Sequence, residues 1–343
     1  MRTISWQDNQ VVMIDQTKLP SKVEFIKTRD IERISEAIYK LEVRGGPAIG
    51  VAVSYGMAIA AQDSKGLEKD DILQNLEKAK EILNCRPTAS NLVWGLKHMM
   101  TFAKKLLSED QSIDLGDAML AEANSLANKE IETNIKMAEF GYQIIPNNAN
   151  IITHCNTGAL CTVDFGHAMG TVFYAHEKGK KIHVYTDETR PRLQGAKLNV
   201  YELSCKGVPY TLITDNTAAY LMQLGKIDLV MVGADRVVAN GDSAAKVGVY
   251  GLAVLAKYHN IPFYMFSTTS TIDMSIETGA GINVEQRDPD EIRVIDGVLI
   301  TIPGANVCNY AFDITPNELM TAIVTERGII KPPFKENIKK LFD

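Results

Sequence analysis

The sequence predicts a two-domain α/β protein: a mainly helical N-terminal domain over residues 1–145, and a C-terminal domain over residues 146–343 built on a parallel, doubly wound sheet. Three observations predict this fold. The chain has 343 residues, enough for about two domains of roughly 150 residues each. Its N-terminal part has helical periodicity. Its C-terminal part alternates apolar runs with helical stretches.

The N-terminal domain is expected to be helical because its apolar residues recur at the period of an α-helix. In the stretch 30–43, four of them share one helical face: Ile31, Ile34, Ile38 and Leu41. The stretches 66–84 and 117–145 show the same period, with charged residues on the opposite face. Residues 10–16, QVVMIDQ, are consistent with a short strand, and the rest of 3–27 shows no clear pattern.

Residues 145–151, IPNNANI, form a candidate linker, because a proline and three asparagines interrupt the helical pattern there. Beyond it, apolar runs typical of buried strands recur, each followed by a helical stretch: 150–154, 181–186, 209–214, 227–234 and 261–268. This alternation predicts a parallel, doubly wound sheet. The order of its strands stays open.

The composition bounds the function classes. The net charge is −6 and the pI about 5.6, whereas nucleic-acid-binding surfaces are basic, so we expect no nucleic-acid partner. Five cysteines without a CxxC pair favour neither a disulfide framework nor a zinc site. The longest apolar-rich run, 50–61, is too short to span a bilayer, and residues 1–10 lack the apolar stretch of a signal peptide. We therefore expect a cytoplasmic protein without a membrane partner.

Polar residues follow five consecutive strands of the expected sheet, at the edge where open α/β sheets bind ligands. They are His154 to Thr157, Asp187 to Arg190, Asp215 and Asn216, Asp235 and Arg236, and Ser267 to Thr269. Asp, Asn, Ser and Thr also favour helix N-caps, so each group alone has a structural alternative. The convergence of all five on one edge favours a site.

Two of these residues have the chemistry of catalytic groups. Cys155 lies beside His154 and precedes residues 156–170, which look helical, and the amino end of a helix lowers the pKa of a thiol. The other cysteines are interpreted as small buried hydrophobic residues. Asp235 follows an apolar strand and becomes a proton donor if its carboxyl is partly shielded from water. The alternative for Asp235 is a salt bridge to Arg236.

Two arginine-containing turns favour an anionic ligand. Arg44, Gly45 and Gly46 precede Pro47, which is typical of a helix start, so backbone N–H groups there form a seat for an anion. A tight turn is the alternative. Arg86 also precedes a proline and a helix. Together the two elements indicate a phosphate. Because the sequence has neither a Walker A loop nor a complete dinucleotide fingerprint, we expect no nucleotide cofactor.

These stretches together carry a resemblance. They are VRGGPAIGVA (43–52), CRPTASNLVWGL (85–96), THCNTGAL (153–160), DETRPRLQGAKL (187–198) and GADRVVANGD (233–242). In order and spacing they resemble the S-methyl-5-thioribose-1-phosphate isomerases, which belong to the wider family of translation initiation factor 2B α/β/δ subunits. The resemblance implies an N-terminal helical domain with a small β portion, a Rossmann-like C-terminal domain, a homodimer, and neither a metal nor another cofactor.

The resemblance also implies a reaction and its residues. The reaction is aldose–ketose isomerisation of S-methyl-5-thio-α-D-ribose 1-phosphate to S-methyl-5-thio-D-ribulose 1-phosphate, in methionine salvage. Carried over by motif, Asp235 is the proton donor and Cys155 the second catalytic group. The residues implied to hold this small anionic sugar phosphate are Arg44, Gly45, Gly46, Arg86, Gln194, Ala245 and Lys246.

Two alternatives stay open. The chain reads GDSAAK at 241–246, with Ala245 where the family usually has an asparagine, and FSTTST at 266–271, where the family commonly has Ala-Pro-Leu before Ser-Thr. These departures favour the same isomerisation on 5-deoxyribose 1-phosphate or, with less support, on ribose 1,5-bisphosphate. The other alternative is a non-catalytic regulatory subunit that binds a sugar phosphate. Retention of Cys155 and Asp235 argues against that role.

Overall fold

The structure, a computed structural model, describes residues 2–87, 89–109 and 113–342. The chain forms two compact units, one of Met1–Glu132 with Ala159–Gly166 and one of Thr133–Gly158 with His167–Asp343. It passes from one unit to the other within helix α5 (Leu115–Tyr142) and on either side of 159–166. The expected mixed α/β fold is confirmed. The division into domains at residue 145 stays a prediction.

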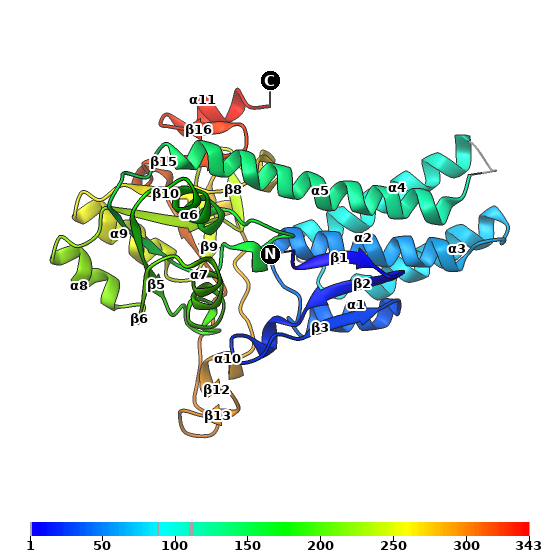
Figure 1. The fold of residues 1–343 in the computed structure, drawn as a ribbon, viewed down its shortest axis with the longest axis horizontal. Helices are drawn as coiled ribbons and strands as arrows, with labels where there is room; N and C mark the ends of the chain where they lie inside the picture. Colours follow the sequence, from blue (N-terminus) through cyan, green and yellow to red (C-terminus); the bar gives the residue numbers. More distant parts are fainter. Residues whose placement is uncertain (1, 88, 110–112, 343) are drawn as a thin grey trace. The chain divides into compact units, whose positions relative to one another are not determined.

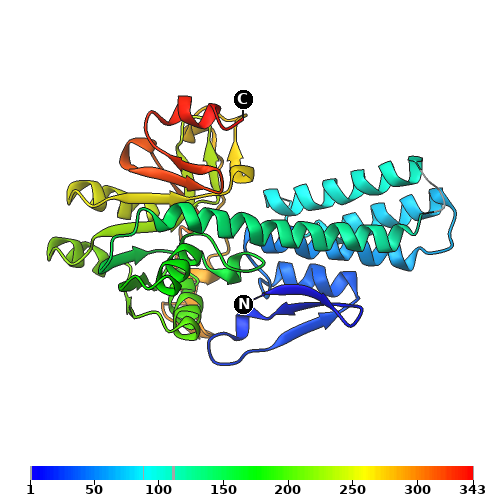
Figure 2. The ribbon, with the colours of Figure 1, turned by 45° about the horizontal axis from the view of Figure 1, so that its top comes forward.

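The first unit begins with a three-stranded antiparallel sheet, drawn as blue arrows in Figure 2. Its strands are β1 (Ile4–Gln7), β2 (Gln10–Ile14) and β3 (Phe25–Thr28). Asp8 and Asn9, both with positive φ, make the tight turn between β1 and β2. The short strand expected over 10–16 is therefore present. Its two partners lie in the stretch where the sequence shows no clear alternation.

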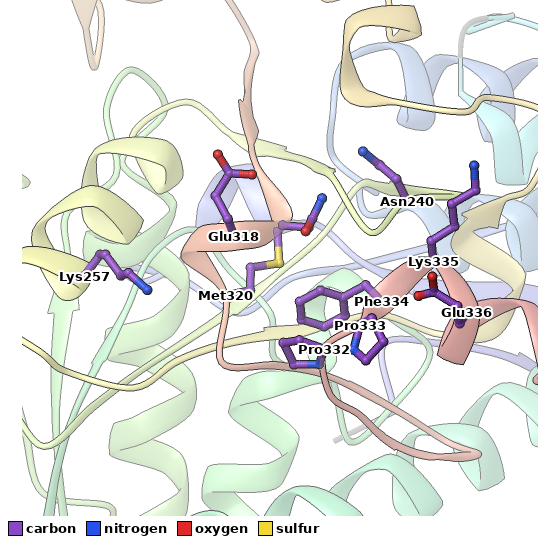
Figure 3. A pocket seen from close by; sticks show the side chains of 10 residues that line it. Asn240, Lys257, Glu318, Met320, Pro332, Pro333, Phe334, Lys335 and Glu336 are labelled. Carbon is purple, nitrogen blue, oxygen red and sulfur yellow. The ribbon is translucent and has the colours of Figure 1, made fainter.

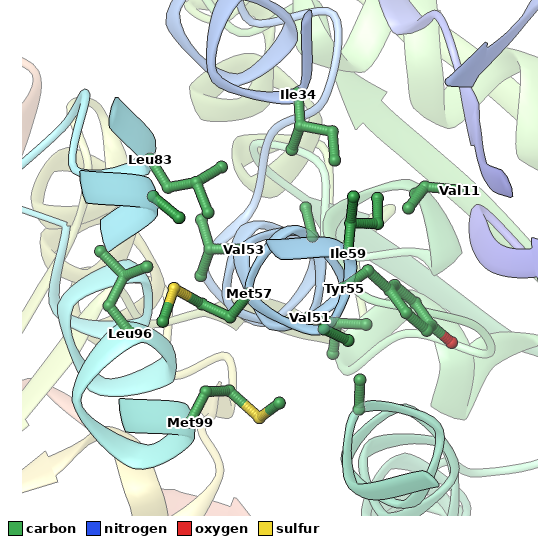
Figure 4. Close-up of a cluster of buried hydrophobic side chains, with 14 of the residues drawn as sticks. Val11, Ile34, Val51, Val53, Tyr55, Met57, Ile59, Leu83, Leu96 and Met99 are labelled. Carbon is green, nitrogen blue, oxygen red and sulfur yellow. The ribbon is translucent and has the colours of Figure 1, made fainter. Parts of the chain in front are cut away.

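The helices of the first unit surround α2. They are α1 (Ile31–Tyr39), α2 (Gly46–Asp63), α3 (Lys69–Leu83), α4 (Ser90–Glu109) and the first part of α5, with short 3-10 turns η1 (Gln16–Lys18) and η2 (Ala159–Cys161). Helix α2 carries apolar or small residues on nearly all sides, and a helix of this kind must be buried. In Figure 4, α2 side chains such as Val53 and Met57 meet Ile34 of α1, Leu83 of α3 and Leu96 of α4. The three predicted helices correspond to α1, α3 and α5.

The second unit is built on a seven-stranded sheet of order β16-β15-β10-β7-β4-β5-β6, parallel except for β16 (Figure 1). The strands are β4 (Ala149–Thr153), β5 (Ile182–Asp187), β6 (Tyr210–Ile213), β7 (Leu229–Gly233), β10 (Phe263–Phe266), β15 (Ala322–Thr325) and β16 (Gly328–Ile330). All five strands expected from the sequence form. The sheet gains β15 and β16, which the sequence pattern did not indicate.

Helices cover both faces of this sheet, because successive strand residues point to opposite faces. Ile152 and Val230 pack with α8 (Thr217–Gln223), α9 (Val249–Tyr258) and α11 (Phe334–Lys339). Their neighbours Ile151 and Leu229 pack with α6 (Ala168–Glu177), α7 (Val200–Lys206) and the last part of α5. The second unit is therefore a three-layer α/β/α structure, as expected for a doubly wound fold.

Shorter elements complete the second unit. A four-stranded sheet joins β11 (Ile272–Asp273), β8 (Arg236–Val238), β9 (Ser243–Lys246) and β14 (Phe312–Thr315). An arm carries α10 (Asp290–Arg293) and the hairpin of β12 (Val294–Ile295) and β13 (Val298–Leu299). The short turns are η3 (Gly195–Asn199), η4 (Thr269–Thr271), η5 (Gly279–Gly281) and η6 (Asn317–Leu319). Among the described residues, no helix combines the length and apolarity needed to cross a membrane.

Candidate active site

The strand order places the candidate site at a topological switch point of the sheet. From β4 the chain continues to β5 and β6 on one side, whereas β7, β10 and β15 follow on the other. Ligands of open α/β sheets bind at the carboxyl ends of strands at such a point. Cys155 lies two residues beyond the end of β4, and Asp235 two residues beyond the end of the neighbouring strand β7. Both predicted catalytic residues therefore lie at this edge.

Hydrogen bonds hold Cys155 in a backbone conformation that non-glycine residues rarely adopt. Its φ is +62°, which costs about 1–3 kcal/mol for such a residue. Its N–H donates to Thr189 Oγ1 at 2.9 Å and its carbonyl accepts from Asn199 Nδ2 at 2.8 Å. The thiol, half-buried, donates to Gln194 Oε1 at 3.4 Å. The surrounding structure thus fixes where the sulfur points.

The helix expected directly after Cys155 is absent. Residues 156–165 form turns that include η2, and helix α6 begins only at Ala168. Phe165 and Gly166 have φ of +71° and +91°, values outside the right-handed helix, and the Asp164 side chain accepts from the N–H of Phe165. The expectation that a helix amino end directly behind Cys155 activates the thiol is therefore wrong.

Lys246 is a buried cation in the same electrostatic environment. It ends strand β9, and its Nζ donates to the carbonyl of Ala311 at 2.7 Å. Burial holds its pKa below the ordinary value, while negative charge on Cys155 and on Asp235 acts in the opposite direction. Negative charge on Cys155 or on Asp235 would therefore favour the protonated form of Lys246. That these three residues form one site stays a prediction.

Asp235 is exposed, so the shielding from water that its role as a proton donor requires is not seen. Its backbone N–H donates to Ala244 at 2.9 Å, which fixes the start of the segment after β7. Arg236 forms an ion pair with Asp273 at 3.3 Å, a partner that the sequence did not suggest. The carboxylate of Asp235 therefore lies at the sheet edge and is accessible.

Gln194 and Ala245 have different surroundings. Gln194 is buried and lies directly before the π-helical turn η3, which directs its amide to Cys155. Ala245 is fully buried, belongs to the apolar cluster under helix α9, and pairs with Asp313 across β9 and β14. Its contact with substrate stays a prediction.

The predicted arginine and glycine residues lie in the first unit. Arg44 is half-buried and its Nε donates to Gln16 Oε1 at 3.2 Å. Gly45 caps helix α2 with φ +93°, and Gly46 is the first residue of that helix. Arg86 donates to the carbonyls of Ile38 and Tyr39 at the end of α1, at 3.2 and 2.7 Å. Thr88 of the same motif lies outside the described residues. The convergence of these residues with Cys155 stays a prediction.

His154 and Asp187 form a buried pair next to Cys155, and the sequence pattern predicted no contact between them. His154 Nδ1 lies 2.8 Å from Asp187 Oδ2, and both side chains are almost fully buried. Burial raises the pKa of Asp187 to about 6 against the pull of His154. Burial lowers the pKa of His154, but the hydrogen bond and the charge of Asp187 outweigh it, so that pKa is raised. The strand-end rule points to both residues, and only their positions reveal the pair.

His154, Asp187 and Asp215 also form the one cluster in the described chain whose ligand atoms could hold a metal ion, all within 4.8 Å of one another. These groups already have protein partners. The two oxygens of Asp215 accept from the N–H groups of Thr189 and Arg190 at 2.7 and 2.8 Å. Hydrogen bonding between strand ends accounts for the cluster.

A pocket of about 490 Å³ opens in the second unit (Figure 3). Met320 and Phe334 supply apolar surface and Lys335 lies at its rim, where it pairs with Glu277 at 3.0 Å. None of the residues that line it is a predicted site residue. The pocket is therefore separate from the group at the switch point.

Comparison with known proteins agrees with the sequence motifs. The model of the initiation factor 2 subunit family matches residues 42–332. The chain is 49% identical over 343 residues, 99% of each chain, to a methylthioribose-1-phosphate isomerase of Desulforamulus reducens. A solved 5-methylthioribose 1-phosphate isomerase of Pyrococcus horikoshii has a TM-score of 0.93 and 43% identity, over 99% of this chain and 95% of that one.

A second solved structure bears a different name. It is described as translation initiation factor eIF-2B, subunit delta, from A. fulgidus, and it has a TM-score of 0.90 and 40% identity over 99% of both chains. Both names fall within the family that the motifs indicated. The chain belongs to the initiation factor 2 subunit family, in the group that contains the methylthioribose-1-phosphate isomerases.

Proposed function

We propose that this chain isomerises S-methyl-5-thio-α-D-ribose 1-phosphate to S-methyl-5-thio-D-ribulose 1-phosphate in methionine salvage. The observation that carries the proposal is the placement of Cys155 and Asp235 beyond the ends of neighbouring strands at the switch point. Negative charge on either residue raises the pKa of Lys246. The full-length similarity to proteins named for this reaction supports the same conclusion.

The residue types suit the chemistry. The phosphate ester on C1 prevents the sugar from opening to a free aldehyde, so an acid must protonate the ring oxygen while the bond from C1 to that oxygen breaks. Asp235 serves as that acid. Hydrogen then moves from C2 to C1, with Cys155 either as the base that forms an enediolate or as a group that stabilises a hydride shift. Lys246 supplies positive charge for the phosphate.

Two variants test the assigned roles. Cys155→Ser and Asp235→Asn are expected to stay folded and to lose about 10²–10⁴-fold in kcat, the usual contribution of an acid–base group. Cys205 is exposed, so its expected burial is wrong, and Asp70 is exposed as well. The two residues provide matched controls, and Cys205→Ser and Asp70→Asn should keep wild-type turnover. Full activity in either site variant would refute its assigned role.

Two further measurements refine the proposal. We expect kcat/KM to be highest for the methylthio sugar. If kcat/KM is higher for 5-deoxyribose 1-phosphate or for ribose 1,5-bisphosphate, that sugar phosphate is the substrate instead. Turnover in D₂O separates the two routes. A base that exchanges its proton with solvent introduces deuterium at C1, whereas a hydride shift does not.

A regulatory subunit is the second candidate, favoured by the name of the A. fulgidus structure. It predicts no turnover on any pentose 1-phosphate, together with stable assembly into a heteromeric complex. The cysteine and the carboxylate at the sheet edge weigh against it, because a subunit that only binds needs neither an acid nor a thiol at that position.

We also propose that the chain acts as a cytoplasmic homodimer. Five exposed large side chains lie on the neighbouring helices α8 and α9 or directly after α8 (Figure 1) and support self-association: Tyr220, Leu224, Tyr250, Val254 and Tyr258. Sedimentation should give twice the chain mass, and Tyr258→Lys should shift it toward the monomer. Phe25→Lys, an exposed change in the first unit, is the control.

A further inference from the structure

The corner that follows Lys246 is held by side chains from two other strands. Val247 joins β9 to α9, and its carbonyl oxygen lies 3.0 Å from Nε2 of His154, the residue after β4. The next N–H, of Gly248, donates to Asp313 Oδ2 on β14 at 2.6 Å. The position of the chain directly after Lys246 therefore depends on His154 and Asp313.

The ring of His154 is buried and packs directly against this corner. The side chain is 2% exposed. A Cβ atom at residue 248 would lie 2.8 Å from its Cε1, and the φ of Gly248 is +109°, so a larger residue fits neither the space nor the backbone. Gly248 thus allows close contact between the imidazole and the corner.

Both ring nitrogens of His154 face acceptors. A carbonyl oxygen only accepts, so Nε2 carries a hydrogen toward Val247. Nδ1 faces Asp187 Oδ2. Without a proton between these two atoms their lone pairs would face and repel each other. Among the described residues, the other oxygen of Asp187, Oδ1, has no hydrogen-bond partner. The carboxylate of Asp187 therefore depends on His154 for its hydrogen bond, and it keeps the imidazole ring in this orientation.

The titratable groups around this ring lie on several elements. The groups that act on His154, or on its partner, are Asp187 and Glu188 at the end of β5, Asp215 after β6 and Asp313 on β14. These carboxyl groups favour a positive charge on the ring. Lys246, on β9, is a cation that, like His154, lowers the pKa of Asp313.

We propose that His154 is a positioning residue for Lys246: its Nε2–H holds the Val247 carbonyl and thereby fixes where the lysine ammonium lies. Asp187 assists by holding the ring from the other side. The inference rests on the proposed function in so far as Lys246 binds the substrate phosphate. A residue that merely fills space at this position would not need a donor directed at Val247.

Two substitutions separate the two ring nitrogens. The amide of His154→Gln reaches the position of Nε2 and can still donate to Val247. The amide of His154→Asn reaches the position of Nδ1 and serves only Asp187. With the methylthio sugar as substrate, we expect His154→Asn to raise KM about tenfold or more and to lower kcat less, and His154→Gln to keep KM within about threefold of wild type.

Acetic anhydride labelling of Lys246, followed by peptide mass spectrometry, reports on the position of the lysine amine without any substrate. The buried amine should react slowly in wild type and in His154→Gln, and about fivefold faster in His154→Asn because the corner has moved. If wild type turns over no pentose 1-phosphate, the proposed function fails while this measurement still tests the positioning.

Two results would overturn the proposal. The first is equal KM and equal labelling in the two variants, whether both match wild type or both are impaired. The second is a wild-type imidazole ¹⁵N spectrum at neutral pH that shows Nε2 of His154 without a hydrogen; the signal is identified by its absence in His154→Gln. That spectrum decides the question even if His154→Asn fails to fold.

Discussion

The thiol of Cys155 donates a hydrogen bond to the amide oxygen of Gln194, with 3.4 Å between Sγ and Oε1. Cys155 follows strand β4 and Gln194 precedes the turn η3, 39 positions further along the chain. An amide is the neutral group suited to this place, because it offers an oxygen to the thiol and, after rotation, a nitrogen donor to the thiolate.

Gln194→Glu should therefore make Cys155 less reactive. A carboxylate beside the sulfur repels the thiolate, which is the reactive form, so alkylation by iodoacetamide should slow about tenfold. Peptide mass spectrometry of the Cys155 peptide measures the rate. Gln223→Glu, on the exposed end of α8, is the control and should leave it unchanged. A wild-type rate in Gln194→Glu would contradict the contact.

Lys246→Met should separate activity from stability. Burial lowers the pKa of Lys246 and so opposes its charge. Removal of that charge relieves the cost of burying it, so the melting temperature should hold or rise. Loss of a charge-assisted hydrogen bond to the substrate should lower kcat/KM about 10–100-fold. Steady-state kinetics and thermal unfolding test both effects, with exposed Lys257→Met as the control. Unchanged kcat/KM would remove Lys246 from the site.

Stability should fall as the pH rises, through the buried pair of His154 and Asp187. The folded-state pKa of His154 is raised, so its contribution is complete below 6.5 and is lost as the pH rises through the folded value. The pKa of Asp187 is also raised, from 3.8 to about 6, and its contribution is lost over that interval. Both shifts therefore favour the folded state at lower pH.

Urea unfolding from pH 6 to 9 measures the contribution of His154 to the free energy of unfolding. One proton changes the free energy of unfolding by at most about 1.4 kcal/mol per pH unit. His154→Gln does not titrate and should show a smaller decline than wild type. Parallel curves for wild type and His154→Gln would exclude this linkage.

Gly45→Ala should destabilise the first unit more than Gly46→Ala. A Cβ at Gly45 would lie 2.0 Å from the carbonyl oxygen of Cys161, and its φ of +93° is strained for alanine, which alone costs about 1–3 kcal/mol. At Gly46 the nearest atom is the movable side-chain nitrogen of Asn91, at 3.0 Å. Chemical unfolding of both variants decides the order. Equal losses would show that crowding at Gly45 is relieved elsewhere.

The fold was predictable where one pattern extends over many residues. The apolar runs that became β4, β5, β6, β7 and β10 are each long enough to show a period, and so are helices α1, α3 and α5. The sheet of β8, β9, β11 and β14 was not predicted, because strands of two to four residues carry no period of their own. The turn after Cys155 was mistaken for a helix, since its composition does not reveal positive φ at Phe165.

The sequence by itself determined the class of fold, the family, and which polar residues follow each strand, because periodicity and motifs are local properties of the chain. Only the tertiary structure decided that β4 lies beside β7, and hence that Cys155 and Asp235 share an edge. It alone also placed His154 between Asp187 and Val247, 33 and 93 positions away. Which distant residues become hydrogen-bond partners depends on the order of the strands. That order is set only when the whole sheet packs and both of its faces are buried.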